Sequence, residues 1–333
     1  MGAKRMLTIE ELEAGINKIS VKMDNNINAG IFAGKTVNLT IMDAAKRPTP
    51  RKLWYELWFE NELCILYADT NMGKSIYSVQ IADEISQTDK VVLFDFELTD
   101  KQFQLRYSDE SGNPHRFSDN LFRFEINSDA DFSEDLEKQI NDGMMAVIER
   151  TGAKIIIVDN LTYLSIETEK SKSALPLMKN LKTLKNRYGL SILCLAHTPK
   201  RNLSNPITRN DLAGSKALIN FCDSAFAIGE SAKDKSVRYI KQIKSRNSEI
   251  KYDSENVLLY QIVKENGNFL KFDFIDYSTE REHLKEPSEK EKENITEKVF
   301  ELKEQGKSFR DIGIELGISH MKVSRILKTK NNV

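Results

Sequence analysis

The sequence is poor in cysteine, in net charge and in long apolar runs. Cys64, Cys194 and Cys222 are its three cysteines, and each lies in an apolar run without metal-ligand spacing. This predicts reduced core residues in a cytoplasmic protein. A formal net charge of -1 excludes a globally basic nucleic-acid coat, so any DNA contact must come from local patches. No apolar run is long enough to span a membrane, and the first residues lack the apolar stretch of a signal peptide.

What the sequence does contain is a phosphate-binding pattern. An apolar run over residues 63–68 leads into a loop that closes with Gly-Lys-Ser, and helical spacing follows. Strand, loop and helix in this order are typical of a P-loop, in which Lys74 reaches the β- and γ-phosphates and Ser75 binds Mg²⁺. The alternative is an ordinary helix N-terminus, but the flanking strand and helix favour phosphate binding. The predicted nucleotide-binding residues are Ala68, Asp69, Thr70, Asn71, Met72, Gly73, Lys74, Ser75 and Ile76.

One position departs from the P-loop pattern. The pattern has glycine where this chain has Ala68. Alanine tolerates a positive φ less well than glycine, so the fit is imperfect if the loop needs that conformation there.

Beyond the loop, short apolar runs alternate with helical patterns to about residue 220. Strands are expected at 90–97, 121–124, 154–159 and 191–197, with helices at 99–108, 133–150 and 174–188. This alternation predicts an α/β fold with a mainly parallel sheet that is covered on both faces. Strands without long helices then follow at 223–228, 237–245, 257–264 and 269–275, which predicts an antiparallel extension of the same sheet.

The chain therefore divides into four predicted segments. These are an N-terminal arm (1–50, with a short helix beginning near Thr8), an ATPase domain (51–277), a charged linker (278–294) and a small all-α unit (295–333). Near the start of the second segment, Trp54, Trp58 and Phe59 would share one face of a helix, or would border the nucleotide site. We favour core packing for these aromatic residues.

The C-terminal segment has the pattern of a helix-turn-helix. Helices are expected at 295–305, 308–316 and 320–328, with Gly317 in the tight turn and a core of Ile312, Leu316, Ile318, Val323 and Ile326. The third helix carries Lys322, Arg325 and Lys328 and no acid, which suits a helix in the major groove of duplex DNA. Many three-helix units bind protein instead, and that alternative remains open.

Hydrolysis of a nucleotide needs a carboxylate for Mg²⁺ and a group that orients the attacking water. Asp159 ends a buried strand and fits the first role, but Asn160 follows it where a second acid would be the base. Glu97, at the end of the strand that follows the P-loop helix, is the preferred base. Asp95 is its competitor, because strand alternation puts both side chains on one side.

Together, residues 68–75, 94–97, 155–159 and 195–197 resemble the RecA-type ATPase core. The nearer resemblance is to hexameric replicative helicases and plasmid RepA-type helicases, and it covers residues 50–275. It implies that Glu97 is the catalytic base and that His197 senses the γ-phosphate. It also implies that Lys244 and Arg246, a Lys-x-Arg pair on a late strand, act on the nucleotide of a neighbouring subunit. Two structural alternatives remain open: an ordinary histidine at a strand end for His197, and a solvated strand edge for Lys244 and Arg246.

A polar loop after His197 is the second candidate for a DNA contact. Lys200 and Arg201 lie in it and would grip the phosphates of a single strand in a central pore. The interpretation is an ATP- and Mg²⁺-dependent, DNA-binding protein, acting as a ring-forming, helicase-like motor of a mobile element and most simply a hexamer. The alternative is an ATP-gated DNA-binding regulator or recombination accessory factor without unwinding activity. A transcription factor with a relic P-loop is disfavoured by the intact site residues.

Overall fold

The computed structural model describes residues 27–127, 129, 136–161, 174–199, 201–212, 216–286, 289–316, 318 and 320–329. The chain divides into two compact units, residues 1–50 and residues 51–333. In the first unit, β1 (Ile27–Ala29) pairs antiparallel with β2 (Phe32–Gly34), and α2 (Val37–Ala45) begins after the N-cap Thr36. The helix expected near Thr8 lies outside the described residues.

A nine-stranded sheet organises the second unit. Its order is β13-β12-β11-β10-β5-β9-β8-β6-β7. The strands from β10 to β7 run parallel, and β11, β12 and β13 form the expected antiparallel extension. The bounds are β5 Leu63–Ala68, β6 Val91–Asp95, β7 Leu121–Phe124, β8 Ile155–Asp159, β9 Ser191–His197, β10 Ser224–Glu230, β11 Val237–Lys244, β12 Val257–Glu265 and β13 Phe269–Ser278.

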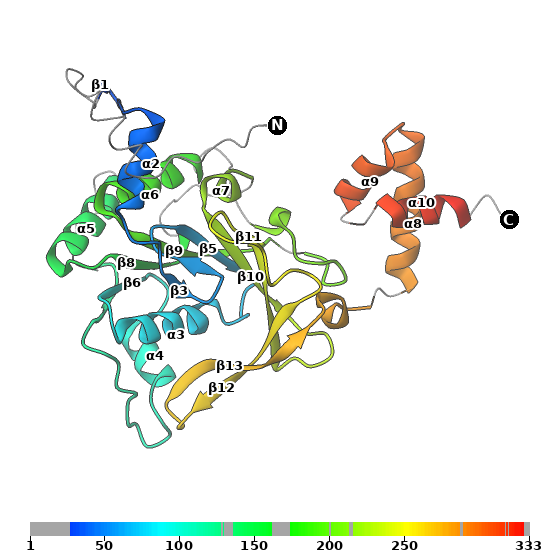
Figure 1. Cartoon of the computed structure of the whole chain (residues 1–333). Coiled ribbons are helices and arrows are strands. Elements are labelled where there is room, and N and C mark those ends of the chain that lie inside the picture. The colour runs from blue at the N-terminus through cyan, green and yellow to red at the C-terminus, as the bar shows by residue number, and fades with distance from the viewer. Residues whose placement is uncertain are drawn as a thin grey trace, which may run out of the picture. The chain divides into compact units, whose positions relative to one another are not determined.

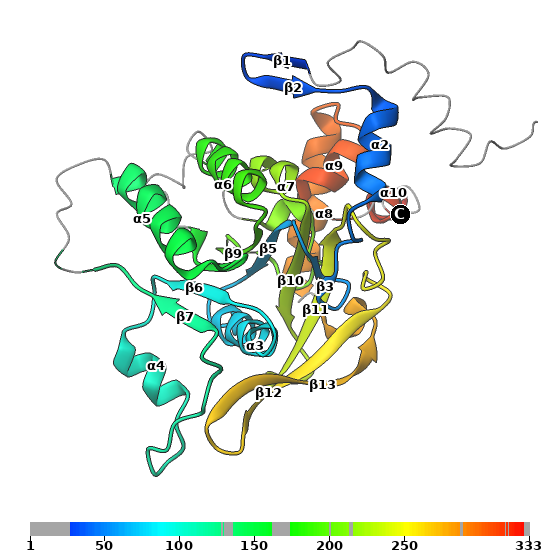
Figure 2. The same cartoon turned by 60° about the vertical axis from the view of Figure 1, so that its left-hand side comes forward.

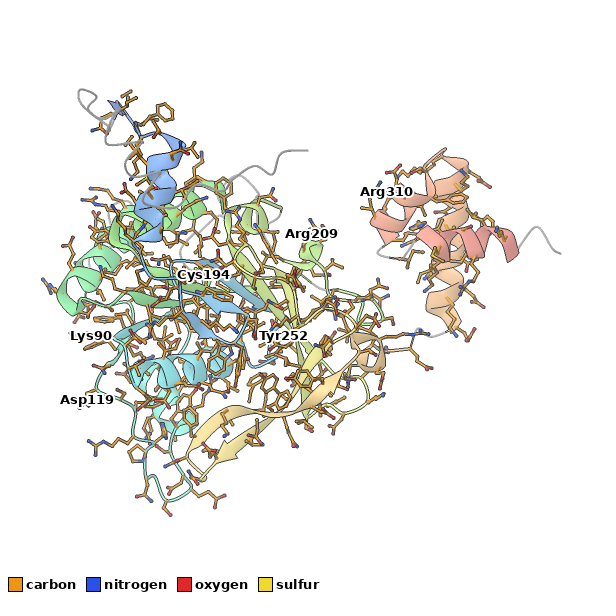
Figure 3. All side chains as sticks on the ribbon, viewed as in Figure 1. Lys90, Asp119, Cys194, Arg209, Tyr252 and Arg310 are labelled. Carbon is orange, nitrogen blue, oxygen red and sulfur yellow. The ribbon has the colours of Figure 1, made fainter. Side chains whose placement is uncertain are left out.

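Helices cover both faces of the parallel strands, as the continuous apolar runs predicted (Figures 1 and 2). One face packs against α5 (Leu136–Thr151) and α6 (Ala174–Tyr188), and the other packs against α3 (Lys74–Ser86). Strand residues alternate between the two cores, so Cys194 of β9 faces α5 and α6 while Leu193 and Leu195 face α3. Figure 3 shows Cys194 inside the sheet, and all three cysteines are buried and free.

The remaining elements of the second unit connect or flank this sheet. They are α4 (Asp100–Arg106), α7 (Lys216–Phe221), and the short 3-10 helices η2 (Arg209–Asp211) and η3 (Glu280–His283). Figure 2 shows the long β12–β13 ribbon extending past the sheet toward α3. Packing of β13 on α3 brings the antiparallel extension to the beginning of the helix that follows the P-loop.

The tryptophan segment is buried, but it is not a helix. Trp54 and Trp58 are almost completely buried and lie in a two-stranded hairpin, β3 (Lys52–Trp54) and β4 (Trp58–Phe59). The Nε1 of Trp54 donates to the hydroxyl of Tyr77 on α3 at 2.7 Å. Core packing is therefore confirmed, whereas the shared helical face was wrong because the chain turns back between the two tryptophans.

Three helices follow η3, and they have a small apolar core of their own. They are α8 (Glu289–Glu304), α9 (Phe309–Leu316) and α10 (His320–Thr329), packed around Val299, Leu302, Ile312 and Val323. The three expected helices are confirmed, although α8 begins six residues before 295. Both η3 and the start of α8 lie in the stretch expected to be a linker, and the domain boundaries stay predictions. Among the described residues, no helix has the length and apolar character to cross a membrane.

Candidate active site

The predicted phosphate-binding loop connects β5 to α3 at the carboxyl edge of the parallel strands. Gly73 has a φ of 91°, and a Cβ there would come within 2.9 Å of the Phe272 ring, so only glycine fits. Ala68 ends β5 in extended backbone, and the missing glycine therefore costs no strain. The first turn of α3 presents backbone N–H groups to the loop, where an anionic phosphate would be stabilised.

Beside this loop is a cavity of about 250 Å³. Residues of the loop line this cavity together with Glu97, which follows β6, and His197, which ends β9. The predicted ligands Ala68, Asp69 and Met72 do not line it: the carbonyls of the first two accept hydrogen bonds from Lys74, and Met72 packs against the core. The lining residues are Thr70, Asn71, Gly73, Lys74, Ser75, Ile76, Glu97, Arg106, His197 and Ile262.

A chain of hydrogen bonds joins three of the predicted catalytic groups. The ammonium of Lys74 lies 3.2 Å from Nδ1 of His197, and Nε2 of the same ring lies 3.5 Å from Oε1 of Glu97. Because an ammonium can only donate, Nδ1 accepts from Lys74, while Nε2 faces both the Glu97 carboxylate and, at 3.1 Å, the amide nitrogen of Asn160. Burial lowers the pKa of Lys74, while the hydrogen bond from His197 holds the pKa of Glu97 below its usual range. Bound phosphates would compete with His197 for Lys74.

Asp159 lies at the end of β8, and its carboxylate contacts the Ser75 hydroxyl across β9. Burial raises the pKa of Asp159 to about 7, although the Ser75 hydroxyl opposes the shift. The Oδ1 of Asp159 is buried, and no described residue forms a hydrogen bond with it. An orphaned carboxylate oxygen beside a hydroxyl fits Mg²⁺, which takes hard oxygen ligands and is usually bound by one or two protein groups plus phosphates.

The structure separates the two candidates for the base by their partners. Asp95 is buried, and its Oδ1 accepts from the backbone N–H groups of Glu97 and Leu98 while its Oδ2 accepts from Nε of Arg123 at 2.9 Å. The Glu97 side chain is 41% exposed and reaches the cavity, where Asn160 also donates to its carboxylate. Asp95 is thus committed to holding the turn after β6, and the carboxylate available to a bound substrate is that of Glu97.

Sequence reasoning missed Arg106, which no motif contains. It lies in the last turn of α4, and a capping box formed by Thr99 and Gln102 fixes the start of that helix. Arg106 lines the cavity, and its buried Nη1 has no hydrogen-bond partner among the described residues. The sequence shows only that Arg106 follows Glu97 by nine residues, and this spacing does not indicate a site residue unless the position of α4 is known. A guanidinium that lines the cavity beside the phosphate-binding loop is a candidate ligand for an anion.

Lys244 and Arg246 lie at the other end of the strands. Lys244 pairs with Ala225 on β10, which in turn pairs with Ile65 near the start of β5. The P-loop follows the opposite end of β5. Lys244 is level with Ile65, three residue steps of about 3.3 Å before Ala68, or roughly 10 Å along the strand. Arg246 contacts Asp223, which binds Leu63, so it lies five steps, or roughly 16 Å, before Ala68. The pair does not approach the cavity of its own chain.

Three of the five predicted DNA-contacting residues are exposed. Lys322, Arg325 and Lys328 are exposed on α10. Arg201 is half-buried, and its Nη1 donates to the carbonyl of Asn205 at 2.9 Å. Lys200 lies outside the described residues. Figure 3 shows Arg209 on η2, in the same polar loop as Arg201, at the carboxyl edge of the sheet.

A family described as an AAA domain matches residues 35–202, slightly more than half of the chain. The match contains β5, the phosphate-binding loop, β6, β8 and β9, and therefore every strand that contributes to the cavity except β12. No curated protein matches the chain.

Proposed function

The chain belongs to the AAA domain family of P-loop NTPases, and on that premise we propose that it hydrolyses ATP with Mg²⁺ as an oligomeric motor on DNA. One observation carries the ATPase assignment: Lys74, His197 and Glu97 form a continuous hydrogen-bonded chain along the cavity beside the P-loop. In this assignment Lys74 and the N-terminus of α3 bind phosphates. Ser75 and Asp159 hold Mg²⁺, which neutralises charge on the phosphates when it is bound.

Glu97 orients and deprotonates the attacking water in this proposal. Its carboxylate is ionised at neutral pH, since the hydrogen bond from His197 lowers its pKa. His197 then links the base to Lys74, so binding of phosphate at Lys74 changes the hydrogen bonding of Glu97. This supports the role of a γ-phosphate sensor for His197, which a purely structural strand-end histidine would not have.

Two arginines are candidates for the charge that develops on the transferred phosphoryl group. Arg106 acts within the subunit, because its guanidinium already lines the cavity. Arg246 acts on a neighbouring subunit, because it lies at the far end of the sheet from its own P-loop. An arginine supplied by a neighbour makes hydrolysis depend on assembly, which supports an oligomer and most simply a ring of six.

DNA binding is assigned to two surfaces. The basic face of α10, with Lys322, Arg325 and Lys328, would contact duplex DNA. The loop after His197, with Lys200 and Arg201, would contact a single strand through phosphates. A hydrogen bond links this loop to the strand that leads into the P-loop: the hydroxyl of Tyr67 on β5 donates to the carbonyl of Thr208 at 2.8 Å.

The second candidate function is an ATP-gated DNA-binding regulator. The separate core of the α8–α10 unit supports it, because a unit with its own core would be able to bind duplex DNA without any strand separation. ATPase rate with and without single-stranded DNA, together with displacement of a labelled strand, distinguishes the two functions. A motor is stimulated by single strands and displaces the label. Duplex binding that changes with nucleotide, without stimulation or displacement, would contradict the motor and support the regulator.

A further inference from the structure

Asp223 is a buried carboxylate outside the ATP cavity, and the function proposed above does not use it. It lies between α7 and β10 and is 8% exposed. Its Oδ2 accepts from the backbone N–H of Leu63 at 3.0 Å and from Nζ of Lys185 at 2.9 Å. Its Oδ1 accepts from Nη1 of Arg246 at 3.1 Å. Burial alone would raise the pKa of Asp223, but these donors hold it below its usual range, so the carboxylate is charged.

Carbonyl groups at the end of α7 also bind Lys244 and Arg246. Nζ of Lys244 donates to the carbonyls of Ile219 at 2.5 Å and of Cys222 at 2.7 Å. Nη2 of Arg246 donates to the carbonyl of Asn220 at 3.3 Å. Carbonyls at the end of a helix have no partner within the helix and carry partial negative charge, so two cations are well placed there.

Lys244 and Arg246 differ in whether their charged groups remain accessible to a ligand. Lys244 is half-buried, and its ammonium is directed to the helix end. Arg246 is held through Nη1 and Nη2, yet its side chain remains 47% exposed. A guanidinium is planar and has five donors, so one edge can be fixed by a carboxylate while another edge binds an anion. Lys244 therefore stabilises the helix end, and Arg246 is the group presented to the outside.

We propose that Asp223 is a positioning residue that holds Arg246 in the orientation needed to contact the nucleotide of a neighbouring copy. The inference rests on the proposed function, because it presupposes a site shared between copies. It goes further in assigning the orientation of Arg246 to one carboxylate and in separating Arg246 from Lys244. The same carboxylate binds the first residue of β5, so the strand that carries the P-loop of one site also anchors the arginine of the next.

Asp223→Asn is the first test, because asparagine keeps an acceptor for Leu63 and removes the charge that holds Arg246. An angstrom of misplacement can cost on the order of a hundredfold in rate, so we expect kcat to fall about tenfold to a hundredfold. KM for ATP should change less than about twofold, since the P-loop is intact. Asp119→Asn, on an exposed loop, is the matched control and should leave both constants unchanged. An unchanged kcat for Asp223→Asn would overturn the proposal.

Mixing subunits then locates the defect. Lys74→Ala subunits have a disabled P-loop and an intact Arg246, whereas Arg246→Ala subunits have the reverse. If Asp223 positions Arg246, Asp223→Asn subunits regain activity when mixed with Lys74→Ala and not when mixed with Arg246→Ala. The opposite pattern would place the defect in the subunit's own P-loop strand and overturn the proposal. Rescue with neither partner would indicate a general structural defect and would also overturn it.

A reference mixture separates this inference from the function on which it rests. Lys74→Ala mixed with Arg246→Ala must regain activity if the site is shared at all. No rescue there refutes the shared site, whereas rescue there with the wrong pattern for Asp223→Asn refutes only the positioning role. If Asp223→Asn does not fold, the double variant Asp223→Asn with Lys185→Gln leaves no unpaired ammonium next to the site and is mixed in the same way.

Discussion

Replacing Arg106 with methionine should stabilise the nucleotide-free protein while weakening ATP binding. Arg106 lines the cavity beside the P-loop, and within the part of the chain that the structure describes its buried Nη1 has no hydrogen-bond partner. A buried donor without a partner costs about 1–3 kcal/mol, and methionine of similar length removes that donor while keeping most of the packing. The free energy of unfolding without nucleotide should therefore rise, or at least not fall.

The effect on ATP binding has the opposite sign. A hydrogen bond to a charged group contributes about 1.5–3 kcal/mol. A loss of about 2 kcal/mol corresponds to roughly a thirtyfold weaker affinity, since every 1.4 kcal/mol is tenfold. Stabilisation by bound ATP follows the ratio of ligand concentration to Kd, so it should shrink in the variant even though the nucleotide-free protein is no less stable.

Denaturant unfolding with and without ATP and Mg²⁺ measures both effects in one experiment. Lys101→Met is the matched control, because it removes a cation from an exposed position on the same helix, α4. The control should change neither the stability nor the shift caused by ATP. A variant at Arg106 that loses stability without nucleotide and keeps the full shift with ATP would refute the assignment and make Arg106 a structural residue.

Three further predictions concern separate parts of the molecule. Glu97→Gln should bind ATP normally and turn over about 10²–10⁴-fold more slowly, the usual loss of a positioned base; a normal rate in steady-state assays would reject Glu97 as the base. A chain ending at Glu286 should keep ATPase activity and lose duplex affinity, because α8–α10 have their own core; equal fluorescence anisotropy with duplex would contradict the DNA-reading role. Hydrogen bonds from Lys251 and Lys52 lower the pKa of Glu56 from 4.5 to about 2. Its ionised form therefore stabilises the fold above pH 4.5, and the benefit is lost as the pH falls toward 2. The exposed lysines reduce the cost of Glu56→Gln to about 1 kcal/mol at neutral pH. A cost that is undiminished at about pH 2, the folded-state pKa of Glu56, would show that the ion pairs are not its cause.

The sheet and the residues at its carboxyl edge were predictable, because local patterns determine them. Buried strands such as β5 and β8 are continuous apolar runs, and each ends where a polar or glycine-rich segment begins. Parallel strands bring those ends to one edge, so Asp159, Glu97 and His197 could be grouped from the sequence alone. The structure then places Glu97 and His197 at the cavity, with Asp159 beside Ser75.

What the sequence did not reveal depends on contacts between distant segments. The spacing of Trp54 and Trp58 suits a helix, yet pairing of the short strands and the bond from Trp54 to Tyr77 make a hairpin. Arg106, in the last turn of α4, lines the cavity although no motif contains it. Asp223 looks like an ordinary residue before a strand until Lys185 and Arg246 arrive from elsewhere in the chain. Local propensity contains no information on such contacts.

The most direct test of the central claim is the Mg²⁺-dependent ATPase rate of the full chain beside that of Lys74→Ala. Lys74 is the residue on which the phosphate site, His197 and Glu97 converge. We predict measurable hydrolysis that requires Mg²⁺ and is abolished in Lys74→Ala, while the variant remains folded. Equal turnover by both proteins, or no hydrolysis by the full chain with Mg²⁺ and DNA present, would contradict it.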